Sequence, residues 1–196
     1  VCATQAGLTV WEDGASHQAL EDIACMRVSP NMTVIVPADA IEAKAAIHAL
    51  AENEGPAYVR LGRSGVPVIN DGDNYKFEIG KGVLLKDGKD ATIIATGIMV
   101  NEALEASKEL ETKGLSVRVI NIHTIKPIDK QIIIKAAEET KAIVTVEEHN
   151  IIGGLYSLVC EKLDKPKKIY PIAIQDTFGE SGTPEELMSK YKIYAD

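Results

Sequence analysis

Short β-branched runs and longer stretches with helical spacing alternate along most of the chain. The β-branched runs predict strands, because residues branched at Cβ fit the pleated, half-buried surface of a sheet. The stretches between them repeat apolar residues three and four positions apart, which predicts amphipathic helices. The predicted strands lie at residues 32–36, 57–61, 77–85, 91–96, 117–122, 142–146 and 169–173, and predicted helices lie at 99–113, 129–140 and 154–163. Strands separated by helices of this length form βαβ units, so we expect an α/β fold with mostly parallel sheets.

Further helices are predicted from their start signals. Asp39, with Glu42 three residues later, has the spacing of a capping box. Thr183 precedes Pro184 and two acidic residues, a strong N-terminal signal, and Asp129 is also expected to cap a helix. The helix that begins at Asp39 is expected to bury one face, formed by Ala40, Ala43, Ile47 and Leu50.

A polar, glycine-containing stretch without periodicity, residues 70–74, is the best candidate for a domain boundary. It separates residues 1–70 from residues 75–196. After it, residues 86–89 are expected to form a hairpin-like turn. The chain opens on the sequence VCAT, which reads as the end of a buried strand that runs into a loop. Since domains seldom begin within an element, we expect the first domain to have a further part upstream of Val1.

Composition narrows the class of partner. Hydrophobic residues make up 45% of the 196 residues and charged residues 26%, an ordinary balance for a globular protein. The net charge is -8 and basic residues form no runs, which argues against nucleic acid or a membrane surface as the main partner. A phosphorylated substrate would therefore have to be held by a local cation. No apolar stretch approaches the length of a membrane span.

The cysteines form no C-x-x-C pair and have no histidine at metal-ligand spacing. We read Cys2, Cys25 and Cys160 as buried small hydrophobic residues in a reducing compartment. The expectation is a cytoplasmic protein with no metal site of its own.

Residues 13–18, DGASHQ, carry the strongest candidate chemistry. Ser16 has the position of an N-cap for a helix that would run through Ala24, and His17 would lie in its first turn. Asp13 and His17 would then both project near a helix N-terminus, where polar ligands are commonly held. From spacing alone, the favoured alternative is a capped turn with a solvated histidine.

Arg63 follows a predicted strand, at the edge where α/β sheets bind ligands. Its guanidinium group matches the geometry of a phosphate. Arg60 lies two residues earlier and is expected to form a surface or interface ion pair. His48 is expected on an exposed helix face, and His123 closes a predicted strand without a catalytic assignment.

The motif D-G-x-[ST]-H-Q-x-x-E-D-[IL]-A at residues 13–24 resembles the pyrimidine-domain motif of transketolases, thiamine-diphosphate enzymes that transfer two-carbon ketol units. Residues 119–129 and 146–149, with Gly153-Gly154, are similar to the C-terminal domain of transketolases. The resemblance implies an incomplete, parallel-sheet pyrimidine-binding domain at 1–70 and a three-layer α/β/α domain at 75–196. It identifies the chain as the C-terminal section of a split transketolase, or a fragment of one, lacking the diphosphate-binding domain.

The resemblance also implies roles for single residues. His17 would be catalytic and cofactor-binding, over the reactive carbon of thiamine diphosphate. Asp13 would accept a hydrogen bond from a sugar hydroxyl, and Arg63 would bind the sugar phosphate. Gln5 stands where many relatives carry a substrate-binding histidine. Trp11 replaces a residue that is usually small, and it could either narrow the pocket or pack at an interface.

The second domain is expected to be structural and dimer-building. Glu147-Glu148-His149 with Gly153-Gly154 could mimic an anion or metal site, but a loop contacting another subunit is favoured. The implied cofactor is thiamine diphosphate with Mg or Ca in the complete enzyme, and none is expected on this chain alone. The implied partners are an N-terminal subunit, a second copy of the chain in a homodimer formed through both domains, and sugar phosphates of the pentose phosphate pathway.

Other members of the thiamine-diphosphate class stay open as alternatives. They are 1-deoxyxylulose-5-phosphate synthase and the beta subunit of 2-oxoacid dehydrogenases. The pair His17-Gln18, followed by Glu21-Asp22, favours transketolase over both. An alternative of another kind is a non-catalytic assembly module, because the carboxylate that protonates the cofactor's aminopyrimidine would precede Val1.

Overall fold

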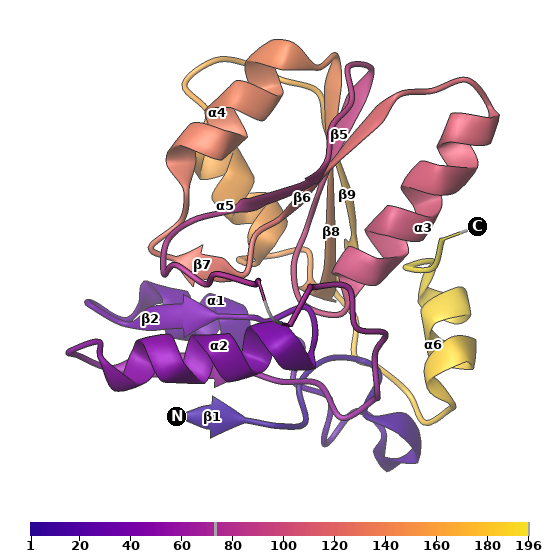
Figure 1. The fold of residues 1–196 in the computed structure, drawn as a ribbon. Coiled ribbons are helices and arrows are strands. Elements are labelled where there is room, and N and C mark those ends of the chain that lie inside the picture. The colour runs from indigo at the N-terminus through magenta and orange to yellow at the C-terminus, as the bar shows by residue number, and fades with distance from the viewer. Residues whose placement is uncertain (73, 196) are drawn as a thin grey trace.

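The computed structural model describes residues 1–72 and 74–195, and within them two sheets are flanked by helices (Figure 1). The larger sheet has the strand order β4-β6-β5-β8-β9. Its strands are parallel except at one edge, where β4 is antiparallel to β6. They span Val83–Lys86 (β4), Ala91–Ala95 (β5), Val117–Asn121 (β6), Ala142–Asn150 (β8) and Ile169–Ile174 (β9). The expected α/β fold is confirmed.

Helices cover both faces of this sheet and make it the middle of three layers (Figure 1). They span Met99–Thr112 (α3), Lys130–Glu139 (α4), Leu155–Lys162 (α5) and Pro184–Tyr191 (α6). Because side chains alternate along a strand, Ile93 and Ala95 of β5 join the core beneath α3 and α6. Ile94 joins the core beneath α4 and α5.

The smaller sheet has the order β1-β3-β2-β7. It consists of Cys2–Ala3 (β1), Thr33–Ile35 (β2), Ala57–Arg60 (β3) and Thr124–Lys126 (β7), and the helices beside it are Asp22–Val28 (α1) and Ala40–Ala51 (α2). The first three strands are parallel, whereas β7 is antiparallel to β2. The second half of the sequence therefore supplies an edge strand to the sheet of the first half.

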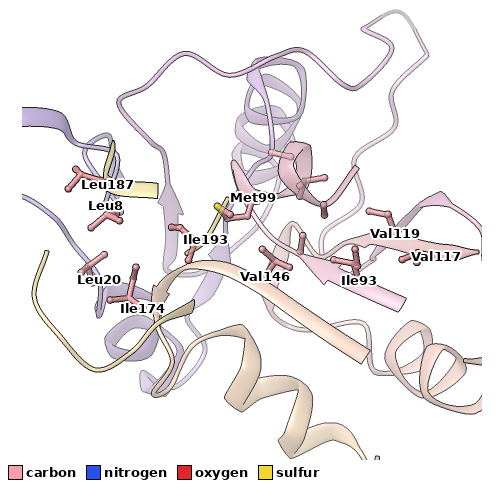
Figure 2. Packing of buried hydrophobic residues seen from close by; sticks show 14 residues of the cluster. Leu8, Leu20, Ile93, Met99, Val117, Val119, Val146, Ile174, Leu187 and Ile193 are labelled. Carbon is pink, nitrogen blue, oxygen red and sulfur yellow. The ribbon is translucent and has the colours of Figure 1, made fainter. Parts of the chain in front are cut away.

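The hydrophobic cores are shared between the two halves of the chain. Leu8 and Leu20 pack in the same cluster as Met99 and Ile174 (Figure 2). On the other face of the larger sheet, Ile23 belongs to the cluster that also contains residues of α4 and α5. The predicted boundary at 70–74 includes Asp73, which lies outside the described residues, and the boundary stays a prediction.

The predicted helix starts at Asp39, Asp129 and Thr183 are confirmed. The Asp39 carboxylate accepts a hydrogen bond from the Glu42 amide at 2.8 Å. Asp129 accepts from the first amides of α4, and Thr183 forms a reciprocal capping box with Glu186. None of the helices in residues 1–72 and 74–195 is long and apolar enough to cross a membrane.

The predicted helix start at Ser16 is wrong. The His17 amide donates to Gly14 O at 3.0 Å, which closes a turn, and α1 begins only at Asp22. The cause is a contact distant in sequence: Ala19 pairs with Ala6, and Ala19 O accepts from the Gly7 amide at 2.9 Å. This pairing keeps the residues just before α1 out of the helix.

The predicted buried face of α2 is also wrong. Glu42 and Ala46 are buried, whereas the side of the helix that carries Ile47 is exposed, with Ile47 itself 46% exposed. The helix is turned this way because the Glu42 carboxylate binds the Asn121 side chain of β6 and the Tyr75 hydroxyl.

Three further expectations fail. The strand predicted at 77–85 is confined to β4, because residues 78–81 form a turn. The turn at 86–89 does not make a hairpin, since β6 lies between β4 and β5. The three cysteines are exposed rather than buried, on the edge strand β1 and on outward faces of α1 and α5.

Candidate functional site

The candidate residues lie in loops that follow two adjacent parallel strands. β1 pairs with β3 so that Ala3 lies opposite Arg60. Gln5 follows the end of β1 and Arg63 follows the end of β3, so both loops leave the carboxyl edge of the sheet. This is the edge where ligands bind in α/β proteins. Gln5 is exposed there.

Asp13 and Arg63 are 50 residues apart in the sequence, and the structure joins them in an ion pair. Asp13 ends a short 3-10 turn, Trp11–Asp13. Arg63 Nη1 also donates to Val10 O at 3.2 Å. The two side chains are 44% (Arg63) and 38% (Asp13) exposed. An exposed pair of this kind contributes only about 0–1 kcal/mol, so a phosphate can compete for the guanidinium group.

Trp11 fastens the two loops to each other. Its indole Nε1 donates to Ser64 Oγ at 3.0 Å, and the Ser64 hydroxyl donates to Thr9 O at 3.0 Å. The backbone of Trp11 has φ = 72°, a conformation that bulky side chains rarely adopt. The ring is 45% exposed and lines a cavity of about 200 Å³ together with Ile98 and Met188.

His17 lies on the surface, in the turn four residues after Asp13, and its Nδ1 is 3.0 Å from Ser16 Oγ. Its neighbour Gln18 is buried and points the other way. Gln18 Nε2 donates to Leu8 O and to Glu180 O, both at 2.9 Å. Gln18 thus joins the loop that contains Leu8 to the C-terminal part of the chain, and it holds the turn that carries the exposed His17.

Arg60 is expected in a surface or interface ion pair, but the structure buries it, at 6% exposure. Its Nε donates to Asp22 Oδ2 at 2.8 Å, and Tyr58 donates to the same oxygen at 2.7 Å. Burial alone would raise the pKa of Asp22, but the Arg60 charge and the two hydrogen bonds outweigh it and lower that pKa. Arg60 is therefore a buried structural cation beside the site.

The expected loop at residues 147–149 is part of strand β8 instead. Its three side chains are buried, those of Glu147, Glu148 and His149. Glu147 accepts from the amides of Leu155 and Tyr156 at 2.6 and 2.8 Å, at the start of α5. Burial raises the pKa of Glu147 to about 7. Glu148 points to the first loop and accepts from the Thr9 amide.

The remaining histidines fit structural positions. His123 stacks on Phe77 with ring centroids 4.2 Å apart, and burial lowers its pKa to about 4. Burial also lowers the pKa of His149 to about 4. His48 is exposed on α2, as predicted. Within residues 1–72 and 74–195, His, Cys, Asp and Glu side chains form no group of three that could hold a metal ion.

Sequence reasoning did not assign Thr9, Gln18, Ser64 or Glu148 to the support of this site. The stretch 147–149 did carry a signal, because three polar residues follow directly on the apolar strand 142–146. The burial of Glu148 and His149 could not be foreseen, since Thr9 and Ala24, which contact them, lie more than a hundred residues away in the sequence.

Two family models match the chain. The model for the transketolase pyrimidine binding domain matches residues 1–68, and the model for the transketolase C-terminal domain matches residues 80–196.

Individual relatives agree with this match. A protein named "Putative transketolase C-terminal section", from Methanocaldococcus jannaschii, is 48% identical over 197 residues, which cover 98% of this chain and 61% of that protein. A 1-deoxy-D-xylulose-5-phosphate synthase from Heliobacterium modesticaldum is 39% identical over 199 residues, covering 100% of this chain and 31% of that protein. A solved structure described as "Split gene transketolase, inactive beta4 tetramer" superposes with a TM-score of 0.92 at 50% identity, covering 99% of this chain and 62% of that one. The chain thus spans 31–62% of the length of these relatives.

Proposed function

This chain belongs to the transketolase family, and we propose that it is the C-terminal subunit of a split transketolase that works with a separate N-terminal subunit. The observation that carries the proposal is the placement of Asp13, Arg63 and the exposed His17 in loops at one edge of the smaller sheet. The likeness to the split-gene structure over 99% of the chain supports the same assignment.

The family domains imply dependence on thiamine diphosphate. The donor set on this chain fits a part of that site: it offers one exposed imidazole, one carboxylate and one guanidinium group, and no metal cluster within the described residues. We therefore assign contact with the cofactor to His17, and the diphosphate and its metal (Mg or Ca) to the partner subunit. When bound, the cofactor supplies the electron sink for breaking the carbon–carbon bond.

The residues of this chain bind and orient the sugar. His17 can donate or accept a hydrogen bond near neutral pH, as is needed at an oxygen on which charge develops. Asp13 accepts from a sugar hydroxyl, because an ionised carboxylate is only an acceptor. Arg63 binds the sugar phosphate, and Gln5 adds a neutral hydrogen-bonding group.

Arg63 gives the sharpest test of this function. The wild-type chain and Arg63→Ala are each combined with the N-terminal subunit and assayed with xylulose 5-phosphate and ribose 5-phosphate, and then with unphosphorylated sugars. A hydrogen bond between charged groups contributes about 1.5–3 kcal/mol, so KM for the phosphorylated sugars should rise steeply while the unphosphorylated sugars are little affected. Arg63→Lys should restore only part of the binding.

Equal losses on both kinds of sugar would mean that Arg63 supports the fold and does not select phosphate. His17→Ala serves as a second variant, because it should lower kcat more than cofactor affinity. An unchanged kcat in an intact complex would remove His17 from the mechanism.

The state of the chain is part of the proposal. We infer a cytoplasmic subunit that forms at least a homodimer and neither turns over sugar phosphates nor binds thiamine diphosphate tightly by itself. The related tetramer, described as inactive, supports the self-association of the chain and its inactivity by itself. Calorimetric titration of the chain with cofactor and magnesium should show no strong site, and binding at micromolar concentration would contradict it.

One relative favours a second candidate, 1-deoxyxylulose-5-phosphate synthesis. The assembled enzyme distinguishes the two reactions by substrate. Activity with pyruvate and glyceraldehyde 3-phosphate, and none with a ketose phosphate donor, would replace transketolase by this reaction. Transketolase of the pentose phosphate pathway requires the opposite result.

A further inference from the structure

The last residues of β8 turn two neighbouring carboxylates to opposite sides. Glu147 and Glu148 are both fully or almost fully buried, at 0% and 3% exposure. Glu147 binds two backbone amides at the start of α5, within the second half of the chain. Glu148, on the other side of the strand, reaches the first half of the chain. The two residues thus have the same chemistry and different structural partners.

Glu148 holds the loop formed by residues 7–13, here named the substrate loop because it ends at Asp13. The Glu148 carboxylate accepts a hydrogen bond from the Thr9 amide. It also occupies the space where a side chain at position 7 would begin, so that a Cβ on Gly7 would overlap the carboxylate. The φ of Gly7 is 90°, which favours glycine for a second reason. Both features fix the start of the loop against β8.

From Thr9 the contacts continue to the candidate site. The Thr9 carbonyl accepts from Ser64 Oγ at 3.0 Å, and Ser64 Oγ in turn accepts from the Trp11 indole at 3.0 Å. Ser64 is adjacent to Arg63, and Trp11 opens the turn that ends at Asp13. Thr9 is thus held through its amide by Glu148 and through its carbonyl by Ser64, and this residue sets the spacing between the loops that carry the ion pair.

The backbone of Glu148 is tied to the same region. Arg60 Nη2 donates to Glu148 O at 3.0 Å and to Ala19 O at 2.9 Å, which joins β8 to the segment that follows His17. Two residues further along β8, the Asn150 amide donates to Leu20 O at 2.8 Å. The end of β8 thus supports both sides of the site.

We propose that Glu148 is a positioning residue for substrate: a carboxylate from the C-terminal domain that fixes the substrate loop and, through it, the placement of Asp13 beside Arg63. This extends the role of that domain beyond assembly. The structural part stands on this chain alone, whereas the effect on substrate rests on the proposed function.

The first experiment uses the chain by itself. Backbone amide hydrogen exchange is followed by NMR in the wild type, in Glu148→Gln and in the matched control Glu147→Gln. Glu148→Gln replaces the carboxylate by a neutral carboxamide, which is a weaker acceptor, so exchange of the Thr9 amide should become about tenfold faster. In Glu147→Gln the Thr9 amide should keep the wild-type rate, and the amides of Leu155 and Tyr156 should exchange faster.

A third variant guards against misfolding. If Glu148→Gln loses the dispersed spectrum of a folded chain, Glu148→Asp, which keeps the charge but withdraws the carboxylate by one methylene group, should show the same local effect. Unchanged exchange of the Thr9 amide in a folded Glu148 variant would overturn the proposal.

The second experiment uses the complex with the N-terminal subunit and ribose 5-phosphate as acceptor. Glu148→Gln should raise KM for the acceptor about tenfold while leaving the apparent affinity for thiamine diphosphate unchanged. A merely structural role would lower the amount of active enzyme and leave KM as it is, and that result would also overturn the proposal. If the wild-type complex shows no activity, the proposed function fails, and the exchange result alone decides whether Glu148 fixes the loop.

Discussion

Acid should destabilise this chain through one buried histidine, His149, at the end of β8. The side chain is 0% exposed. Its Nδ1 lies 2.7 Å from Asn150 O, and its Nε2 accepts from the Ala24 amide at 3.4 Å. These contacts assign the proton of the neutral ring to Nδ1. A second proton on Nε2 would face an N–H group and would be buried beside Arg60, so protonation must disrupt the native contacts.

The size of the effect follows from the pKa. Burial, with a smaller contribution from Arg60, lowers the pKa of His149 from 6.5 to about 4. Between these values the unfolded chain binds a proton that the folded chain does not bind. The stabilising contribution is therefore fully present above pH 6.5 and is lost as the pH falls to 4. At 1.36 kcal/mol per pKa unit, the loss amounts to about 3 kcal/mol.

The assay is urea unfolding at pH 7, 5 and 4 of the wild type, His149→Gln and a control, His48→Gln, which changes an exposed histidine of α2. The free energy of unfolding of wild type minus that of His149→Gln should fall by about 3 kcal/mol between pH 7 and pH 4. Glu147 lies 3.9 Å from His149 Nδ1, and because its pKa is raised, its protonation stabilises the folded chain as the pH falls. The same series on a Glu147→Gln background removes this opposing contribution to the free energy of unfolding. A difference that stays constant within about 0.5 kcal/mol, as expected for His48→Gln, would refute the reasoning.

Three further outcomes are expected from the fold. Ile94→Ala, which empties a fully buried position in the middle of the larger sheet, should lower the free energy of unfolding by about 2–5 kcal/mol in urea titrations. A loss below about 0.5 kcal/mol, the least that Ile→Val typically costs in a core, would contradict the packing. Thr183→Ala should cost about 1 kcal/mol by the same measurement, since it removes the capping box of α6, whereas Thr183→Ser should cost little. All three cysteines should react with a thiol reagent in the folded chain, because each is exposed, and a thiol that reacts only after denaturation would be buried, contrary to the structure.

Local patterns were sufficient for most of the larger sheet. Its inner strands begin as apolar runs rich in β-branched residues, and two of the helices that cover it, α4 and α6, start at residues whose side chains cap them. Asp129 and Thr183 could be assigned from their neighbours alone, because a cap involves only the next three residues. The three-layer arrangement then follows from the alternation of strands and helices.

Contacts between distant segments could not be foreseen in the same way. The segment after Ser16 has helical spacing, yet pairing of Ala19 with Ala6 keeps it out of a helix until Asp22. β8 continues through three polar residues because Arg60, the Thr9 amide and the start of α5 satisfy them. The ion pair of Asp13 with Arg63 joins two loops, and only the packing of β1 against β3 brings these loops together.

The position of Trp11 has a practical consequence, because it is the only tryptophan in the chain. It lies outside both cores, on the substrate loop, with its indole N–H bonded to Ser64. The intrinsic tryptophan fluorescence of the unlabelled protein therefore originates at the site itself. A sugar, a cofactor or a partner subunit that covers the half-exposed ring should shift its emission to shorter wavelength, so that assembly and binding can be titrated optically without a probe.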